Sequence, residues 1–409
     1  MLTGLDLLMN GPSAAVRQRL RTSRIGVLTH SASRDRQGRD LLRVLEELGT
    51  EPELAFAPEH GLHGVEQAET PVPSDGATGA DAEGRPRRAL SLYGTTKDSL
   101  TPKREDLEGL DVLVIDLADV GARYYTYVWT ALIAARAAAA AGVHTLVLER
   151  PNPISGDPAS VEGAPQGEGF LSFVGLEPVP IRHALTLAEL IALFLERDGK
   201  PLGPDGALSV LRAQGWERYR TAAAWGRPFF PPSPNMPRLE TALVYPGACL
   251  LEGTNLSEGR GTTLPFQVLG APFLDGSKLA DALSDAGTPG ALVHPVSFRP
   301  TFDKHAEAVC HGVMLHVTDS HLFRPVATYL RLIALARAQA PDEFAFETRT
   351  YEFESERRAF DLLIGSTAVR HAIEAGATPD EVVDQACPVD AAWQSTVAEA
   401  PERVARASA

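Results

Sequence analysis

Cysteine is scarce in this 409-residue sequence. Its three cysteines, Cys249, Cys310 and Cys387, lie far apart and include no Cys-x-x-Cys pair. Such a set indicates neither a disulfide framework nor a zinc site, and buried apolar thiols are the expected outcome. The sequence therefore predicts no metal site and no other cofactor.

Basic residues are outnumbered by acidic ones. The chain has 38 Lys and Arg against 53 Asp and Glu, which gives a formal net charge of -15 and a pI of 5.2. Nucleic acids and anionic membranes bind basic surfaces, so neither is expected as a partner. A single anionic group held by a local arginine remains compatible with this charge.

Long apolar runs are missing as well. None reaches the about 20 residues needed to cross a bilayer, so no transmembrane segment is predicted. Residues 1–6 lack the basic and apolar regions of a signal peptide. The chain as written is expected to be cytoplasmic, or secreted or periplasmic if a leader was removed.

Neither of two phosphate-binding fingerprints occurs. A dinucleotide site requires Gly-x-Gly-x-x-Gly after the first strand, and a P-loop requires Gly-x-x-x-x-Gly-Lys-Ser/Thr. The nearest string, at residues 259–263, lacks the third glycine and lies far from the first predicted strand. A nucleotide enzyme is therefore not predicted.

What the sequence does contain is an alternation of strand and helix patterns, and its length exceeds the size at which one core stops growing. Such repeated units indicate an α/β fold with a Rossmann-like parallel sheet. Beyond residue 241 the pattern changes to that of a smaller α+β auxiliary domain. We predict a catalytic domain at 1–240 and an auxiliary domain at 241–409 that closes the cleft. The strands are expected at 24–29, 111–117 and 144–148, and the helices at 41–48, 128–141 and 184–198.

Polar clusters follow the predicted strands. In a parallel sheet, ligands bind outside the carboxyl ends of the strands, so these clusters are expected to converge on one site. They occupy residues 30–33, 58–61, 116–127 and 149–153.

The turn at residues 56–64 stands out among these clusters. Pro58 and Gly61 break an apolar run at once and expose the carboxylate of Glu59 beside the imidazole of His60. Turns held by rigid elements often carry catalytic groups.

Five ordered motifs resemble one family, the bacterial exo-β-N-acetylmuramidases of the NamZ type. The resemblance runs from about residue 5 to beyond residue 319 and implies a Rossmann-like domain, an auxiliary domain and a cleft between them. It also implies release of N-acetylmuramic acid from the non-reducing ends of peptidoglycan fragments. The motifs are APEHG at 57–61, DVGARYYTY at 119–127, RPNP at 150–153, PSPNMP at 232–237 and EGTNLSEGRGT at 252–262.

Within this resemblance Glu59 is predicted as the general acid, with a pKa raised by its apolar surroundings. Most glycosidases use a second carboxylate, for which Asp116 and Asp119 are available, although the substrate's acetamido group offers another route. Arg260 is the first choice for binding the lactyl carboxylate and Arg123 the second. The remaining predicted substrate-binding residues are His60, Tyr125, Asn152, Asn235, Tyr245 and Asn255.

Two other functions stay open from the residues alone. A metal-dependent hydrolase would use Glu59, His60, His63 and Asp116 as ligands, because His-x-x-His binds a metal when both rings share a face. A non-catalytic protein would close its two domains on an amino sugar or muropeptide.

Overall fold

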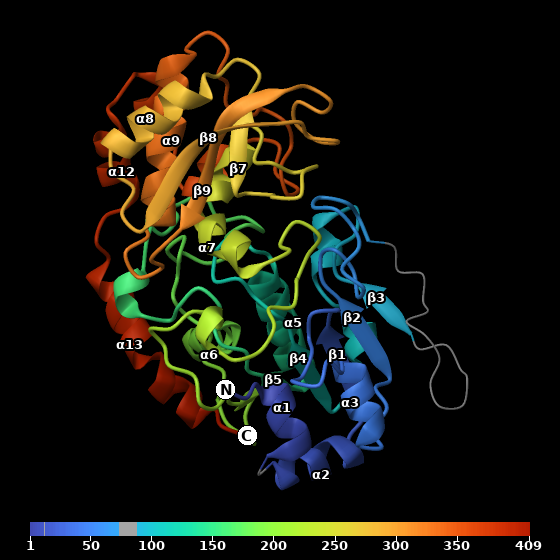
Figure 1. Ribbon diagram of the computed structural model, residues 1–409. Coiled ribbons are helices and arrows are strands. Elements are labelled where there is room, and N and C mark those ends of the chain that lie inside the picture. Colours follow the sequence, from blue (N-terminus) through green and yellow to red (C-terminus); the bar gives the residue numbers. More distant parts are fainter. Residues whose placement is uncertain (12, 73–87) are drawn as a thin grey trace.

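The computed structural model describes residues 1–11, 13–72 and 88–409. Within these residues the first part of the chain forms a six-stranded parallel sheet in the order β3-β2-β1-β4-β5-β6 (Figure 1). The strand order reverses between β1 and β4, which confirms the predicted Rossmann-like arrangement. The strands are β1 (Ile25–Thr29), β2 (Leu54–Ala57), β3 (Ala89–Ser91), β4 (Val112–Asp116), β5 (His144–Leu148) and β6 (Leu208–Leu211).

Helices cover both faces of this sheet. Side chains alternate along a strand, so Val112 and Val114 of β4 pack on one helical layer while Leu113 and Ile115 pack on the other. The first layer contains α1 (Gly4–Asn10), α2 (Ala14–Thr22) and α3 (Leu41–Glu47), and the second contains α4 (Arg104–Leu107), α5 (Tyr127–Ala141) and α6 (Leu187–Arg197).

Local sequence signals set the ends of the long helices. At α6 the Thr186 hydroxyl accepts a hydrogen bond from the Glu189 amide, and the Glu189 carboxylate accepts one from the Thr186 amide, a capping box. Helix α5 ends at Gly142, whose φ of 76° is left-handed and favours glycine.

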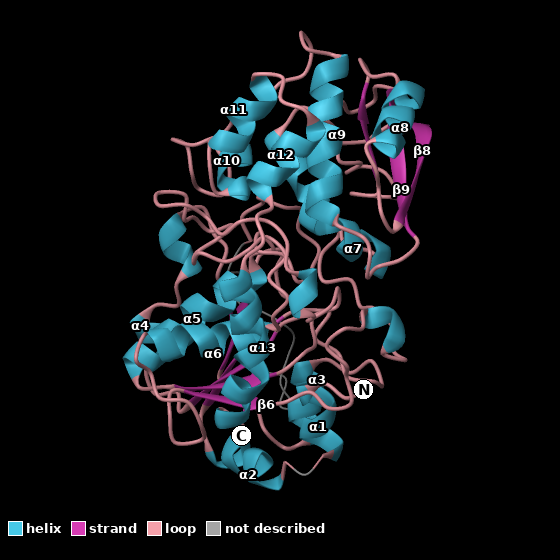
Figure 2. Cartoon of the chain, turned by 90° about the vertical axis from the view of Figure 1, so that its left-hand side faces the viewer, coloured by secondary structure: helices cyan, strands magenta, loops and turns pink. Residues whose placement is uncertain are grey.

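The chain beyond residue 240 forms a second unit in which the described residues contain a three-stranded antiparallel sheet, in the order β7-β9-β8. Figure 2 shows its helices stacked beside this sheet and above the first domain. The predicted auxiliary α+β domain is thus confirmed. Its elements are β7 (Val268–Ala271), β8 (Ala291–Phe298), β9 (Cys310–Val317), α7 (Leu239–Ala248), α8 (Gly276–Asp285), α9 (Pro325–Gln339), α10 (Ala359–Ile364), α11 (Ala368–Glu374) and α12 (Pro379–Ala386).

The last helix, α13 (Ala391–Arg406), returns to the first domain. It packs against α6, and the amide of Val210 in β6 donates a hydrogen bond to the Ala407 carbonyl. The predicted division into 1–240 and 241–409 stays a prediction. Short 3-10 helices complete the described elements: η1 (Lys97–Leu100), η2 (Pro158–Ser160), η3 (Ala222–Ala224) and η4 (Cys249–Gly253).

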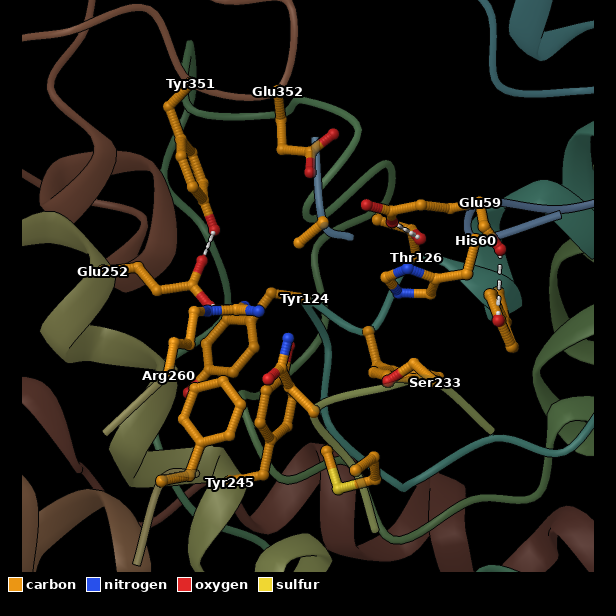
Figure 3. Close-up of a pocket in the computed structure, with 16 residues that line it drawn as sticks. Glu59, His60, Tyr124, Thr126, Ser233, Tyr245, Glu252, Arg260, Tyr351 and Glu352 are labelled. Carbon is orange, nitrogen blue, oxygen red and sulfur yellow. Dashed lines mark hydrogen bonds and ion pairs between the residues drawn. The ribbon is translucent and has the colours of Figure 1, made fainter. Parts of the chain in front are cut away.

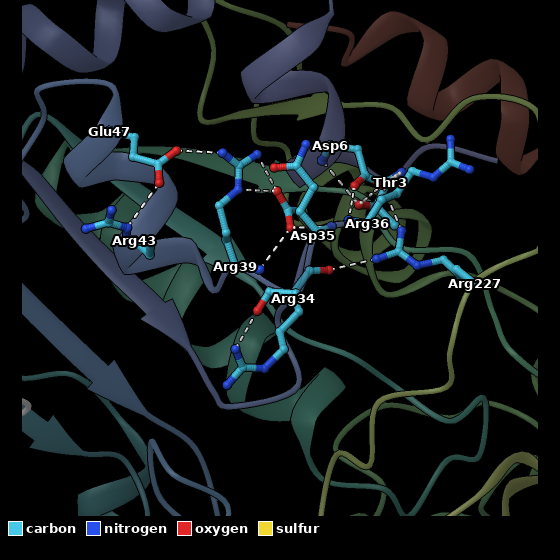
Figure 4. A network of polar contacts seen from close by, with 11 residues as sticks. Thr3, Asp6, Arg34, Asp35, Arg36, Arg39, Arg43, Glu47 and Arg227 are labelled. Atoms are coloured by element: carbon cyan, nitrogen blue, oxygen red, sulfur yellow. Dashed lines mark hydrogen bonds and ion pairs between the residues drawn. The ribbon is translucent and has the colours of Figure 1, made fainter.

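A polar network fixes the proline-rich segment 226–237 to the sheet domain (Figure 4). Asp6, in the capping box of α1, accepts hydrogen bonds from the Arg36 amide at 2.6 Å and from the Arg227 guanidinium at 2.7 Å. Arg227 also donates to the carbonyl of Arg34, in the loop after β1. This anchorage holds the start of the segment whose later residues reach the candidate site.

The sequence from 66 to 88 is rich in Pro, Gly, Asp and Arg, a composition typical of a long surface loop, but most of it lies outside the described residues, which end at 72 and resume at 88. No helix in the described ranges is long and apolar enough to cross a membrane.

Candidate active site

A pocket lies where the two domains meet (Figure 3). The first domain contributes the turn after β2 and the start of α5, and the second contributes α7, the glycine-rich loop after η4 and the segment around residue 351. The lining residues are Glu59, His60, Ala68, Tyr124, Tyr125, Thr126, Tyr127, Ser233, Asn235, Met236, Tyr245, Glu252, Arg260, Phe266, Tyr351 and Glu352.

Glu59 is held firmly at one side of this pocket. It is 5% exposed, and its carboxylate accepts hydrogen bonds from the Thr126 hydroxyl at 2.7 Å and the Glu69 amide at 3.2 Å. The hydroxyl of Tyr127 donates to the Glu59 carbonyl. His60 follows with a left-handed φ of 67°, which turns the chain sharply after β2. The turn therefore presents the Glu59 carboxyl to the pocket in one orientation.

Aromatic rings form another wall of the pocket. Tyr245 meets Tyr124, Tyr125 and Phe266 edge to face, with ring centroids 5.0 to 5.8 Å apart. Such a wall offers rigid apolar area for a sugar ring. Trp129, which lies close to Tyr124 and Tyr125 in the sequence, is not part of this wall because it is fully buried in the core.

Arg260 lines the pocket but already has acidic partners. Its Nη2 lies 2.7 Å from a Glu252 carboxylate oxygen and its Nε lies 3.1 Å from a Glu258 oxygen. The guanidinium also stacks over the Phe266 ring at 5.0 Å. Its charge is therefore largely neutralised before any ligand enters.

Two further carboxyl groups of the pocket, Glu252 and Glu352, were not predicted from the sequence. Glu252 accepts a hydrogen bond from the Tyr351 hydroxyl at 2.7 Å, and Glu352 accepts one from the Tyr93 hydroxyl at 2.9 Å. Burial raises the pKa of Glu352 well above its ordinary value, and the charge of Glu59 raises it further. Glu252 opens the glycine-rich motif at 252–262, whereas no glycine or proline occurs between residues 342 and 364, so no sequence signal pointed to Glu352.

The predicted second carboxylates lie elsewhere. Asp116 is fully buried and forms a bidentate pair with Arg150, with N–O distances of 2.5 and 2.9 Å. Asp119 lines a neighbouring pocket together with Arg150, and burial raises its pKa to about 7. One carboxylate oxygen of Asp119 accepts a hydrogen bond from the Gly121 amide. Neither side chain lines the pocket that contains Glu59.

This placement predicts a structural effect for Asp116→Asn. The variant should lose about 1–3 kcal/mol of unfolding free energy, because a buried charge-assisted pair is weakened. Its kcat on the substrate proposed below should stay within about threefold of wild type. Chemical denaturation and steady-state kinetics measure both quantities. A kcat loss of a hundredfold without destabilisation would restore Asp116 as the second carboxylate.

Three predicted substrate-binding residues instead contact the protein itself. The buried guanidinium of Arg123 donates to the carbonyls of Ala164, Val179 and Leu363. Asn152 donates to the Leu185 carbonyl and accepts from the Ile154 amide. Asn255 donates to the Glu343 carbonyl and accepts from the Ala345 amide. The structure thus gathers six of the predicted catalytic and binding residues in the pocket: Glu59, His60, Tyr125, Asn235, Tyr245 and Arg260.

The candidate metal ligands are not gathered in this way. His63 lines a separate pocket beside β1 and α3, and Asp116 is paired with Arg150. Over residues 1–11, 13–72 and 88–409, no group of three or more His, Cys, Asp or Glu is placed to hold a metal ion. The metal-dependent hydrolase therefore has no assembled ligand set in this part of the chain.

Comparison with known proteins shows similarity along nearly the whole chain. Residues 25–240 match the N-terminal domain model of exo-β-N-acetylmuramidase NamZ, and residues 243–400 match the C-terminal one. The peptidoglycan β-N-acetylmuramidase NamZ of Bacillus subtilis (strain 168) is 37% identical over 388 residues, which are 93% of this chain and 86% of that protein.

Two solved structures share the fold. Both are proteins of the DUF1343 family from Bacteroides fragilis NCTC 9343. The first has a TM-score of 0.79 at 27% identity and covers 99% of this chain and 97% of its own. The second has a TM-score of 0.67 at 24% identity, covers 100% and 98%, and supports the fold alone. The two family models and the relative from Bacillus subtilis show that the chain belongs to the exo-β-N-acetylmuramidase NamZ family.

Proposed function

We propose that this protein is a glycoside hydrolase that removes N-acetylmuramic acid from the non-reducing ends of peptidoglycan fragments. The observation that carries the proposal is the pocket between the domains, with Glu59 fixed at its side, in a chain of the NamZ family. The relative from Bacillus subtilis is a peptidoglycan β-N-acetylmuramidase by name, and it supports the same substrate class here.

The residues that line the pocket suit an amino sugar. The aromatic and apolar side chains of the lining can hold the ring face, while its carboxyl and amide groups can meet the hydroxyl and acetamido groups of the sugar.

In the proposed reaction Glu59 acts as the general acid. Its carboxyl proton passes to the glycosidic oxygen as the bond from that oxygen to the anomeric carbon breaks, so the leaving sugar departs as a neutral alcohol. Thr126 and the Glu69 amide orient the carboxyl through the two hydrogen bonds described above. Water then supplies the hydroxyl group of the released N-acetylmuramic acid, and its proton restores the acid.

Product analysis on two defined disaccharides tests this function. The disaccharide with N-acetylmuramic acid at its non-reducing end should be cleaved, and the one with N-acetylglucosamine there should be cleaved much more slowly. Prolonged treatment with a chelator should leave turnover unchanged. Activity that chelation abolishes and zinc restores would favour the metal-dependent hydrolase. Binding of the sugars without turnover of either would favour the non-catalytic reading.

A further inference from the structure

Recognition of the substrate's charge poses a question in this pocket. N-acetylmuramic acid carries a lactyl carboxylate that N-acetylglucosamine lacks, yet three Glu side chains line the pocket. Among the described lining residues Arg260 is the one Arg or Lys, and it is paired with Glu252 and Glu258. An anionic sugar therefore needs a further hydrogen-bond donor. The inference below rests on the proposed function and concerns how the same site selects its sugar.

Several donors of the pocket are already used within the protein. A ligand that took these hydrogen bonds would leave buried acceptors unpaired, which is unfavourable. The engaged pairs are Tyr351 with the Glu252 carboxylate, Asn235 with the Gln67 side chain, Tyr127 with the Pro232 carbonyl and Tyr124 with the Pro246 carbonyl.

Glu352 differs from these donors. Figure 3 shows its carboxyl group turned into the pocket toward Glu59. One oxygen accepts the hydrogen bond from Tyr93, and the other has no protein partner in the described part of the chain. The residue is 7% exposed, and no Lys, Arg or His of the described residues pairs with it. In its acid form Glu352 therefore holds a free O–H donor that faces the site.

The surroundings of Glu352 favour this acid form. Burial is the largest cause that raises the pKa of Glu352, and the negative charges of Glu59, Glu69 and Glu252 raise it further, while the hydrogen bond from Tyr93 lowers it. The cations on neighbouring segments are taken up elsewhere: Arg349 pairs with Glu69, Lys97 with Glu354, and Arg260 with Glu252 and Glu258.

The backbone holds Glu352 in a fixed and unusual conformation. Glu352 and Phe353 have left-handed φ values of 46° and 67°, which non-glycine residues adopt at a cost of about 1–3 kcal/mol. Contacts on both sides tie this segment to the first domain: the Arg349–Glu69 pair at 3.1 Å and the Phe353 ring at 5.5 Å from Tyr93. The carboxyl group of Glu352 is thus held in position before a ligand binds.

We propose that Glu352, as a carboxylic acid, is the residue that recognises the lactyl carboxylate of the terminal muramyl sugar. Its O–H donates to one carboxylate oxygen, a short and strong type of hydrogen bond. Tyr93 holds the other oxygen of Glu352 in place. N-acetylglucosamine has no group to accept this bond, so the selectivity comes from Glu352.

The proposal has a definite pH signature. Because the pKa of Glu352 is raised, its O–H donor is present at low pH and is lost as pH rises through that pKa. Above it two carboxylates face each other and repel. The KM of the muramyl substrate, divided by that of its glucosaminyl analogue, should then rise by about 10–100-fold across the transition.

Glu352→Gln is the decisive variant, because its amide donates a hydrogen bond at every pH. Its KM ratio should stay low and become independent of pH. Glu352→Ala should show a high ratio at every pH. Glu354→Gln, two residues away and outside the pocket lining, is the matched control and should keep the wild-type pH profile. Melting curves verify folding of all three.

Two kinetic outcomes would overturn the proposal. If the KM ratio of folded Glu352→Gln keeps the pH dependence of wild type, another group binds the lactyl carboxylate. A kcat loss above a hundredfold on both substrates, with unchanged KM ratio, would make Glu352 a proton-transfer residue instead. Calorimetric binding of free N-acetylmuramic acid and N-acetylglucosamine to wild type and Glu352→Gln tests recognition without turnover. If neither disaccharide is cleaved but this binding follows the predicted pattern, only the proposed reaction fails.

Discussion

Replacing Glu59 by glutamine should lower kcat on an unactivated muramyl disaccharide by about 10²–10⁴-fold, the usual contribution of a general acid. Glutamine keeps the size of the side chain and can still accept the Thr126 or Glu69 hydrogen bond, but it has no proton to transfer. An aryl muramide with a good leaving group needs less protonation, so its kcat should fall clearly less. Steady-state kinetics on both substrates gives the comparison.

A melting curve and a second variant control this experiment. Since the side chain keeps its shape, Glu59→Gln should melt within a few degrees of wild type. Glu69→Gln, whose backbone amide rather than side chain contacts Glu59, should lose far less activity. Near-normal cleavage of the disaccharide by folded Glu59→Gln would exclude Glu59 as the acid. An equal loss on both substrates would indicate a role other than protonation of the leaving group.

Arg123→Ala should cost about 3–5 kcal/mol of unfolding free energy. The change removes a fully buried guanidinium and leaves the carbonyls of Ala164, Val179 and Leu363 without their donor. Leu363 belongs to α10 in the second domain, so the change also loosens the domain contact. Urea denaturation followed by fluorescence measures the loss.

Arg123→Lys is the matched control for this variant. It keeps the charge but lacks the planar fork that reaches several carbonyls, so its stability should fall between wild type and alanine. Substrate selectivity should not change in the folded fraction of either variant. A stable Arg123→Ala protein with a raised KM only for the muramyl substrate would return Arg123 to the role of lactyl anchor predicted from the sequence.

The position of Glu59 could be predicted because its signals are local. An apolar strand interrupted by Pro58 and Gly61 places a turn at the carboxyl end of β2, where a parallel sheet binds ligands. The same rule failed to separate Asp116 from the site. Asp116 also ends a strand, but Arg150, which follows β5, lies close enough to pair with it. Which polar groups at a sheet edge pair with each other depends on contacts between strands.

Arg260 illustrates the same limit on the glycine-rich loop. Its place at the pocket was predictable from a run of polar residues on a flexible backbone, and the structure puts it there. Its pairing with Glu252 and Glu258 was not, because the fold of the loop decides which of several nearby carboxylates a guanidinium meets.

Local pattern alone was enough for the strands β1, β4 and β5, their parallel arrangement and the Glu59 turn, since the periodicity of apolar residues and the chemistry of turns act over a few residues. The edge strands β3 and β6 were not predicted. Only the tertiary structure assembled the rest of the pocket. Tyr93 and Glu352 are 259 residues apart in sequence and meet through a hydrogen bond between the domains. The unusual backbone at Glu352 is held by packing, and burial among other carboxyl groups raises its pKa. These effects depend on neighbours that the fold brings together, so no short stretch of sequence encodes them.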